Sequence, residues 1–426
     1  MKSYDIVIVG GGMVGAAIAL GISQQTDYKI AIVDNQSLDQ LASWPKADRI
    51  DNRVSAVTLA TVDFLSQLRV WPAIEAFRRS AFKRMFVWDS EGTGNIQFTA
   101  EEVHRRQLGY IIENRAIQAA LWQQLEQQAA IDVYAEHVLT ALVANTPAVL
   151  SSPRASFNTN TNSISQDYPY TVVLNGGQEL SASLVIGADG ARSQVRRLAQ
   201  FTTREWDYLH HALVATVKWE NSHQHTAWQV FLPTGPLALL PLNNLSTEQD
   251  ELSQDVTSIV WSAPATHIEK LMKAPTTMLL KQLSQATEAR LGEAIEIKDQ
   301  ASFPLRQRHA KQYYKKGVVL AGDAAHTIHP LAGQGMNLGM ADALALVTEV
   351  ARAAKRGDTP GGEHILSRYQ RQRMPDNLMM MGLMESFQHT FQSQQLPVRW
   401  LRNQGLSWVN KQAWLKQQLI KKAVGL

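Results

Sequence analysis

The chain has 426 residues, enough for two to three packed units, and its apolar fraction of 45% and charged fraction of 19% are typical of a globular protein. It contains no cysteine, which excludes disulfides, thiolate metal sites, iron–sulfur clusters and cysteine nucleophiles. The net charge of +3 is small, and its positive excess is confined to the C-terminal end, unlike the basic stripe of a nucleic-acid-binding protein.

The N-terminal segment predicts one βαβ unit. Ile6–Val9 is a short β-branched run, typical of a strand buried in a parallel sheet. Met13–Ile22 is small and apolar enough for a helix packed tightly on that sheet. Lys29–Val33 is a second strand that ends at Asp34, and the next residues, 35–55, are polar and loop-like.

The turn between the first strand and the helix contains the pattern G-x-G-x-x-G. Gly10 permits the tight turn, Gly12 lets backbone amides approach a pyrophosphate, and Gly15 permits close helix–strand packing. Asp34 follows Gly15 by 19 residues, where a carboxylate can accept hydrogen bonds from a ribose and would repel a 2′-phosphate. We expect a dinucleotide site, and NADP is a poor candidate for this pocket; the alternative is a purely structural glycine turn.

The middle of the chain is dominated by strand patterns, most densely between residues 201 and 261. A Ser-, Asn-, Thr- and Pro-rich stretch from Asn145 to Asp167 predicts an exposed hairpin insertion, and Glu248–Glu251 an acidic loop. The predicted helices here are Val57–Leu68, Asn114–Gln128 and Thr277–Leu291, and the predicted strands are Phe82–Trp88, Asn95–Phe98, Thr171–Leu174, Ser183–Ile186, Leu213–Trp219, Trp228–Leu232, Leu237–Leu242 and Ser258–Trp261.

Two further glycine-centred motifs follow buried strands. Gly187–Ser193 comes directly after Ser183–Ile186, and a simple polar turn is an equally good interpretation of it. The third motif begins after Val318–Leu320 with Asp323, which can bind the hydroxyls of a long cofactor. It continues to Gly333–Asn337, where a helix start exposes amides to an anionic group.

The helix opened by the third motif is predicted over Gly335–Ala354, with a charge-matched stop at Gly357. Before it, His326 is expected to be a hydrogen-bonded structural residue rather than a base. No catalytic residue is assigned in this region; the candidates for facing a cofactor and substrate are His329, Pro330 and Leu331.

The three motifs, in this order, resemble the flavoprotein aromatic hydroxylases of the p-hydroxybenzoate hydroxylase class over nearly the whole chain. The resemblance implies FAD, with Asp34 among the residues that hold its AMP half, Asp189 contributing to both FAD and NAD(P)H, and Arg53 near the cofactor. The cofactor-binding residues that it implies are Gly10, Gly12, Gly15, Asp34, Arg53, Asp189, Asp323, Gly333, Gly335, Met336 and Asn337.

Within that class the chain is most similar to the ubiquinone-biosynthesis hydroxylases, in Leu108–Asn114, Trp228–Pro236, Gly322–Asn337 and Ala423–Leu426. The second and last of these favour members that hydroxylate C6 of a demethoxy-type benzoquinol. The resemblance implies that NAD(P)H reduces FAD and that O2 then gives a C4a-hydroperoxide, which hydroxylates an electron-rich ring. The alternatives are a flavin-dependent reductase or dehydrogenase of the same fold and a non-catalytic prenyl-binding carrier.

Such a site must exclude water, and Trp228, Phe231 and Leu239–Leu242 form a suitable apolar wall, unless they are simply core. The predicted fold class is α/β, with a Rossmann-like FAD-binding domain of the glutathione-reductase type, an inserted α+β substrate domain and a C-terminal helical region. The domains are expected at 1–75, 100–200 and 302–370 for FAD, 76–99 and 201–301 for substrate, and 371–426 for the helical region.

The C-terminal region carries six basic residues and no acidic one after Glu385, so the rest of the chain carries about −3 (+3 − 6). Trp400, Trp408 and Trp414 lie among them, a mixture that suits an anionic interface. A polyprenyl substrate also prefers lipid. We therefore expect a cytoplasmic protein with peripheral contact at the inner membrane, or with a ubiquinone-biosynthesis complex, through 396–426; packing of this tail on its own core is the alternative. The sequence contains no run of about 18 apolar residues, so we expect no membrane-spanning helix.

Overall fold

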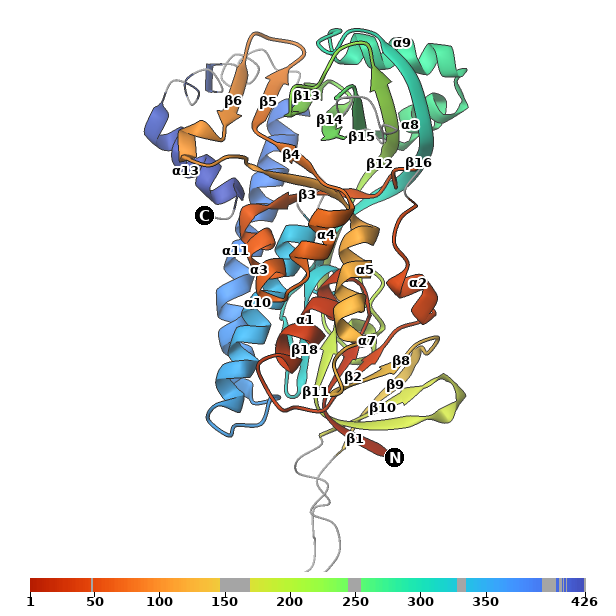
Figure 1. Ribbon diagram of the computed structural model, residues 1–426, viewed down its shortest axis with the longest axis vertical. Helices are drawn as coiled ribbons and strands as arrows, with labels where there is room; N and C mark the ends of the chain where they lie inside the picture. Colours follow the sequence, from red (N-terminus) through yellow and green to blue (C-terminus); the bar gives the residue numbers. More distant parts are fainter. Residues whose placement is uncertain are drawn as a thin grey trace, which may run out of the picture.

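Figure 1 shows an elongated molecule, with one sheet and its helices in the lower half and a second sheet in the upper half. The N-terminus lies at the lower end, and the C-terminal helix lies beside the upper half. This computed structural model describes residues 1–46, 49–145, 169–243, 254–327 and 335–392, together with 404–405, 408, 410 and 412–424.

The lower half is built on an eight-stranded sheet with a parallel centre, which confirms the α/β prediction. In spatial order its main strands are β17 (Tyr314–Lys315), β18 (Val318–Leu320), β11 (Glu179–Gly187), β1 (Lys2–Val9), β2 (Ile30–Val33) and β8 (Ile131–Tyr134). All but β17 run parallel. Two antiparallel strands extend from the first half of β11, namely β10 (Tyr170–Leu174) and β9 (Leu139–Ala144).

Helices cover the central parallel strands, and β2 and β18 are buried along their whole length. The glycines and alanines of α1 let α10 approach closely; a Cβ on Gly21 would lie 2.9 Å from Val347 of α10. Burial on both faces explains why the central strands are continuous apolar runs rather than alternating ones. The helices of this half are α1 (Met13–Ser23), α2 (Leu38–Ala42), α3 (Leu59–Gln67), α4 (Trp71–Phe77), α5 (Asn114–Leu125), α7 (Gln194–Leu198), α10 (Gly335–Ala354) and α11 (Glu363–Gln392).

The upper half is an eight-stranded sheet, antiparallel except where β13 meets β5. Two helices, α8 (Ala265–Lys273) and α9 (Thr276–Ala286), pack on one face. In spatial order the strands are β19 (His326–Thr327), β16 (Ala294–Ala310), β12 (Thr203–Trp219), β15 (Val256–Pro264), β14 (Gly235–Leu242), β13 (Thr226–Leu232), β5 (Arg84–Asp89) and β6 (Asn95–Thr99).

Successive side chains of a strand point to opposite faces of the sheet, so the residues of the predicted apolar wall lie on two different faces. Leu239 and Trp228 lie on the face covered by α8 and α9, so these two residues are core rather than wall. Leu240 and Leu242 lie on the opposite face. There they pack toward a small sheet of β3 (Val54–Thr58), β7 (Gly109–Glu113) and β4 (Ser80–Phe82) and toward α13 (Ala413–Val424).

Several of the predicted helix and strand boundaries were wrong. Val57 and Thr58 end a strand instead of beginning a helix, because β3 pairs with β7. The polar stretch after Asp34 contains α2, which a capping box at Ser37 begins. The helix predicted at Thr277–Leu291 is α9, which already ends at Ala286, and the preceding helix, α8, was not predicted. The helix predicted at Gly335–Ala354 has those bounds, and Gly357 has φ +73°, which confirms the predicted stop.

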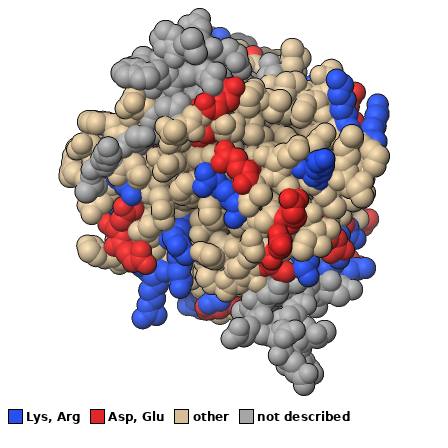
Figure 2. Space-filling view, turned by 90° about the horizontal axis from the view of Figure 1, so that it is seen from above, with Lys and Arg blue, Asp and Glu red and all other residues tan. Residues whose placement is uncertain are grey.

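Among the described residues, no helix is long and apolar enough to cross a bilayer. The predicted hairpin insertion, from 146 onward, and the acidic loop lie outside the described residues. We propose that the two large sheets are the cores of the FAD-binding and substrate domains, and that 371–426 forms the helical region. Figure 2, seen from the upper end, shows basic and acidic side chains interspersed on that face.

Candidate functional site

The site begins where four neighbouring strands end in register. Val9 of β1 lies opposite both Val33 of β2 and Gly187 of β11, and Gly187 lies opposite Leu320 of β18. Each strand is followed at once by a segment singled out in the sequence: the first glycine turn, Asp34, the second motif and the third motif. Ligands of α/β sheets bind at this carboxyl edge, so the parallel register brings all four segments to one place.

The first glycine turn is held by contacts that only glycine allows at two positions. Gly10 has φ +107°, and a Cβ there would lie 2.4 Å from the carbonyl oxygen of Ala188. A Cβ on Gly15 would lie 1.9 Å from the carbonyl oxygen of Gly10. The predicted roles of these residues, a tight turn and close packing of the helix on the strand, are confirmed as geometry.

Two side chains from distant elements fix the peptide groups of Gly11. The Asp34 carboxylate accepts the Gly11 N–H at 2.6 Å and the Gln36 N–H at 2.8 Å. The indole N–H of Trp122, a fully buried residue of α5, donates to the Gly11 carbonyl at 2.8 Å. The sequence indicated Asp34 as a site residue. It did not indicate Trp122, because a tryptophan in a predicted helix is ordinarily only an apolar core position.

Gly12 leaves an open approach to the start of α1. A Cβ built there would have no atom of the described residues within 4 Å, and its φ of −65° is ordinary. Gly12 is the N-cap and offers no side-chain hydrogen bond, and no acidic residue lies in the first turn. The first-turn N–H groups of a helix have no intrahelical acceptor, and a helix start without a side-chain cap or an acidic residue can bind an anion.

The third motif lies directly against this helix start. Val14, in the first turn of α1, is 2.7 Å from the position of a Cβ on Gly339 in α10 and 3.2 Å from that of a Cβ on Gly322. The beginnings of α1 and α10 are therefore neighbours.

Asp323 and Arg53 face the same space. The Asp323 side chain is exposed, yet enough protein surrounds it that desolvation raises its pKa above the ordinary value, while His326 and Arg53 act to lower it. The side chain is therefore accessible, although protein groups surround it. The Arg53 guanidinium lies 5.4 Å from the centre of the Phe303 ring, so a residue of the upper sheet borders this part of the site.

The Asp189 carboxylate is engaged within its own turn. It accepts hydrogen bonds from the Ser193 hydroxyl at 2.5 Å and from the Gln194 and Val195 N–H groups at 2.6 and 3.2 Å, at the start of α7. Burial nevertheless raises its pKa. Arg196 of α7 ties this motif to the third one, donating to the carbonyl of Ala324 at 2.8 Å; sequence reasoning missed it.

Asn337 anchors the beginning of α10 to β3 and α3. Its amide group donates to the Ala56 carbonyl at 2.7 Å and accepts from the Thr58 N–H at 3.0 Å and the Thr61 hydroxyl at 2.9 Å. Met336, one residue earlier, is buried, and Gly335 is the first residue of the helix. We propose that Asn337 positions the helix start, with its side chain directed into the protein.

A buried ion pair holds the segment that carries Arg53, and no sequence signal predicted it. Glu113 accepts the Asp51 N–H at 2.6 Å and the guanidinium of Arg78 at 2.6 Å. Burial is the largest influence on Glu113 and raises its pKa. The same guanidinium donates to the Arg49 carbonyl at 3.1 Å. Glu113 belongs to Leu108–Asn114, one of the segments noted for family resemblance, and this contact gives that segment a physical role.

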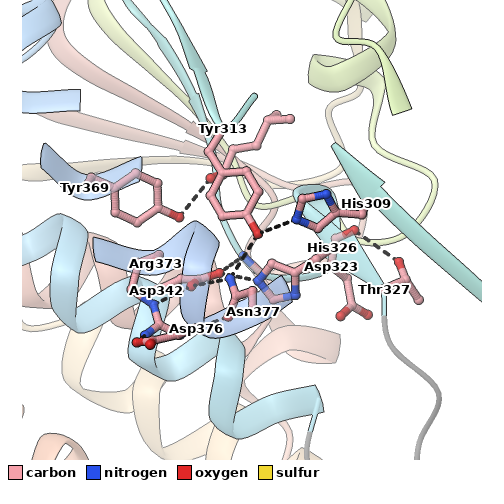
Figure 3. A network of polar contacts seen from close by, with 12 residues as sticks. His309, Tyr313, Asp323, His326, Thr327, Asp342, Tyr369, Arg373, Asp376 and Asn377 are labelled. Atoms are coloured by element: carbon pink, nitrogen blue, oxygen red, sulfur yellow. Dashed lines mark hydrogen bonds and ion pairs between the residues drawn. The ribbon is translucent and has the colours of Figure 1, made fainter. Parts of the chain in front are cut away.

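His326 is the structural residue that the sequence predicted: it is buried and its Nε2 lies 2.5 Å from Asp342 (Figure 3). His329, Pro330, Leu331 and Gly333 lie outside the described residues. The site is thus a parallel-sheet edge with two adjoining helix starts and two carboxylates, Asp34 and Asp323. These features define a dinucleotide-binding fold of the flavoprotein type, with an antiparallel sheet beside the cofactor site.

Comparison with known proteins agrees with this class. The family model described as an FAD binding domain matches residues 3–380, so the chain belongs to that family, and it is an FAD-dependent monooxygenase. It is 36% identical to the 3-demethoxyubiquinol 3-hydroxylase of Escherichia coli, over 99% of this chain and 98% of that protein.

A second relative is the mitochondrial ubiquinone biosynthesis monooxygenase COQ6 of Xenopus tropicalis, 32% identical over 98% of this chain and 92% of that protein. Among solved structures, p-nitrophenol 4-monooxygenase PnpA from Pseudomonas putida has a TM-score of 0.72. The match covers 100% of this chain and 99% of that one at 16% identity, which shows a shared fold.

Proposed function

We propose that this monooxygenase hydroxylates the quinol ring of a polyprenylated ubiquinone precursor, with NAD(P)H as reductant and O2 as oxidant. The observation that carries the proposal is the full-length similarity to a 3-demethoxyubiquinol 3-hydroxylase. We therefore propose a demethoxy-type quinol as the substrate. A phenol or quinol hydroxyl activates the ring carbon itself, so the protein need not supply a strong nucleophile.

The residues at the sheet edge fit FAD. We propose that Gly10, Gly12 and Asp34 hold the adenosine half and the pyrophosphate, because Gly12 leaves an open cradle at the start of α1. We propose that the Asp323 carboxylate, which follows β18 in the third motif, binds the hydroxyls of the ribityl chain. Gly335 opens α10, whose free N–H groups favour a nearby negative charge by about 0.3–2 kcal/mol.

When bound, FAD supplies the redox and oxygen-transfer chemistry, and the chain's own residues bind it, orient it and keep the site dry. The apolar cluster between the upper sheet and the small sheet, which includes Leu240, Leu242 and Phe82, is suited to excluding water. We propose that Arg53, held by the pinned segment from Arg49 to Asp51, closes the cofactor side of the cavity over Phe303.

The test uses the purified holoenzyme with NADH or NADPH, a short-chain demethoxy quinol and oxygen-18. The expected product is heavier by one oxygen atom that comes from O2, and it is absent from the anaerobic control. NAD(P)H oxidation that the quinol stimulates without any hydroxylated product would favour the reductase alternative. A colourless protein that cannot be reconstituted with FAD would favour the carrier.

We further propose peripheral contact between the C-terminal region and a membrane. Trp408 and Trp414 are 58% and 73% exposed, which suits insertion of their rings at an interface. Lys416 pairs with Glu102 at 2.5 Å and Ile420 is buried, so α13 is anchored on the protein by one side. We therefore propose that only part of the basic C-terminal region contacts the membrane: Trp408 and Trp414 do so, and Lys416 does not.

Sedimentation with anionic liposomes tests this contact. The double variant Trp408→Ser and Trp414→Ser should lose most of its binding at low salt, because both side chains are exposed and their removal spares the fold. Trp206→Ser is the matched control, since Trp206 is 41% exposed on the upper sheet. Equal sedimentation of the double variant and the control would refute the contact.

A further inference from the structure

The Asp342 carboxylate, at the start of the third turn of α10, lies at the centre of a network of hydrogen bonds. Asp342 is fully buried. Its Oδ2 accepts the Gly322 N–H at 3.1 Å and lies 2.5 Å from His326 Nε2. Its Oδ1 accepts Arg373 Nε at 2.8 Å and Asn377 Nδ2 at 3.2 Å. Figure 3 shows His326, Arg373 and Asn377 gathered around it.

The donors come from two separate parts of the fold. Gly322 and His326 flank Asp323 in the third motif, whereas Arg373 and Asn377 lie on α11, one helical turn apart. A buried carboxylate is costly unless paired and fully hydrogen-bonded. Here both lone-pair sides of the group are satisfied, so the third motif, α10 and α11 are held together at a single point.

Asp323 lies between the two anchored residues of the third motif. In Figure 3 its carboxylate points away from the network that joins His326 to Asp342. Gly322 has φ +59°, a conformation that its N–H bond to Asp342 helps to maintain. The direction of Asp323 into the cavity therefore depends on the two bonds that Asp342 accepts from either side of it.

We propose that Asp342 is a positioning residue for FAD: it acts through Gly322 and His326 to aim Asp323 at the cofactor. This inference rests on the proposed role of Asp323. It differs from a general contribution to stability, because it predicts loss of cofactor affinity that depends on the presence of the Asp323 carboxylate.

The rest of the network supports this assignment. Arg373 also pairs with Asp376 at 3.0 Å and bonds the Asn377 oxygen at 3.0 Å, so its guanidinium has little freedom. Asn377 continues to the hydroxyl of Tyr313 at 3.1 Å. Arg373 and Asn377 of α11 are thus held in place by several contacts. Asp342 is fixed by these two residues, and it in turn orients the third motif through Gly322 and His326.

The test is a double-mutant cycle on the FAD dissociation constant, measured by fluorescence titration of the apoprotein. Asp342→Asn and Asp323→Ala should each weaken FAD binding about tenfold or more. In the Asp323→Ala background, Asp342→Asn should cause less than a threefold further change. Trp219→Phe is the control for stability alone: it removes a buried hydrogen bond to Thr257 in the upper half and should leave FAD affinity unchanged.

Additive effects of Asp342→Asn and Asp323→Ala would overturn the positioning role, and so would unchanged affinity in Asp342→Asn. Unchanged affinity in Asp323→Ala would overturn this inference and the proposed role of Asp323 together. If Asp342→Asn does not fold, His326→Phe replaces it in the cycle, because phenylalanine has no donor for Asp342 and the carboxylate keeps its ion pair with Arg373. None of these readouts involves the quinol, so they are independent of the proposed hydroxylation.

Discussion

Gly12 and Gly15 permit a test that separates the binding of FAD from the stability of the fold. Both glycines belong to one short turn, and substitution by alanine adds the same methyl group at each. The structure gives the two methyl groups different surroundings: at Gly12 no atom of the described residues lies within 4 Å, whereas at Gly15 the carbonyl oxygen of Gly10 lies at 1.9 Å. We expect Gly12→Ala to impair cofactor binding and Gly15→Ala to impair folding.

The magnitudes follow from these distances. At Gly15 the methyl carbon and the Gly10 oxygen must separate by about 1 Å to reach the 3.0 Å limit of real contacts (3.0 − 1.9). Overpacking of this kind costs about 1–3 kcal/mol or more. At Gly12 the backbone is ordinary, so the unfolding free energy of the apoprotein should change by less than about 1 kcal/mol. Loss of one charge-assisted bond to the pyrophosphate there costs about 1.5–3 kcal/mol, a 10- to 100-fold loss of FAD affinity.

The assay is urea denaturation of each apoprotein together with FAD titration by fluorescence. Gly12→Ala should keep the urea midpoint of the wild type and bind FAD weakly. Gly15→Ala should lower the midpoint. The reasoning is refuted if Gly12→Ala binds FAD as the wild type does, or if it destabilises the apoprotein as much as Gly15→Ala.

Three further predictions concern the neighbourhood of the site and the pH dependence of stability. Asp34→Asn should weaken FAD binding about tenfold, because the Gly11 N–H loses a charge-assisted acceptor; unchanged affinity in the titration would contradict it. Trp122→Phe leaves the buried Gly11 carbonyl without its indole donor and should lower the unfolding free energy of the apoprotein by about 1–3 kcal/mol. An unchanged urea midpoint would contradict that. Burial lowers the pKa of His223 and of His309 to about 4, below the ordinary 6.5, so their contribution to stability is present above pH 6.5 and is lost as the pH falls toward 4. The urea midpoint should fall over that interval, and a flat profile would argue against it.

The sequence was most informative where the signal is local. The first glycine turn, Asp34 and the bounds of α10 could be predicted because glycine spacing, strand composition and helix periodicity lie within a few residues of each other. The same holds for the strand that precedes the third motif. Parallel pairing then brings these segments together, and the in-register ends at Val9, Val33, Gly187 and Leu320 confirm that step.

The parts that sequence reasoning missed depend on partners far apart in the chain. Glu113 meets Arg78 and the Asp51 amide, 35 and 62 positions away. Neither contact leaves a periodic pattern, and each residue alone reads as a charged position on a surface. For a similar reason β12 was predicted only from Leu213 onward and β16 was missed, because both strands carry many polar residues and their mutual pairing defines their length.

These missed contacts share one feature: they hold backbone rather than present side chains to a ligand. Trp122 and Asp34 hold Gly11, Arg196 holds Ala324, and Asp342 holds Gly322. A cofactor bound through backbone amides needs each amide within hydrogen-bond reach, about 2.7–3.2 Å, and glycine-rich turns lack side chains of their own to restrain them. Buried side chains on neighbouring helices therefore have to supply that restraint. It follows that substitutions at such residues should change cofactor affinity before they abolish folding, and that the residues which shape this site most strongly are not limited to those that face it.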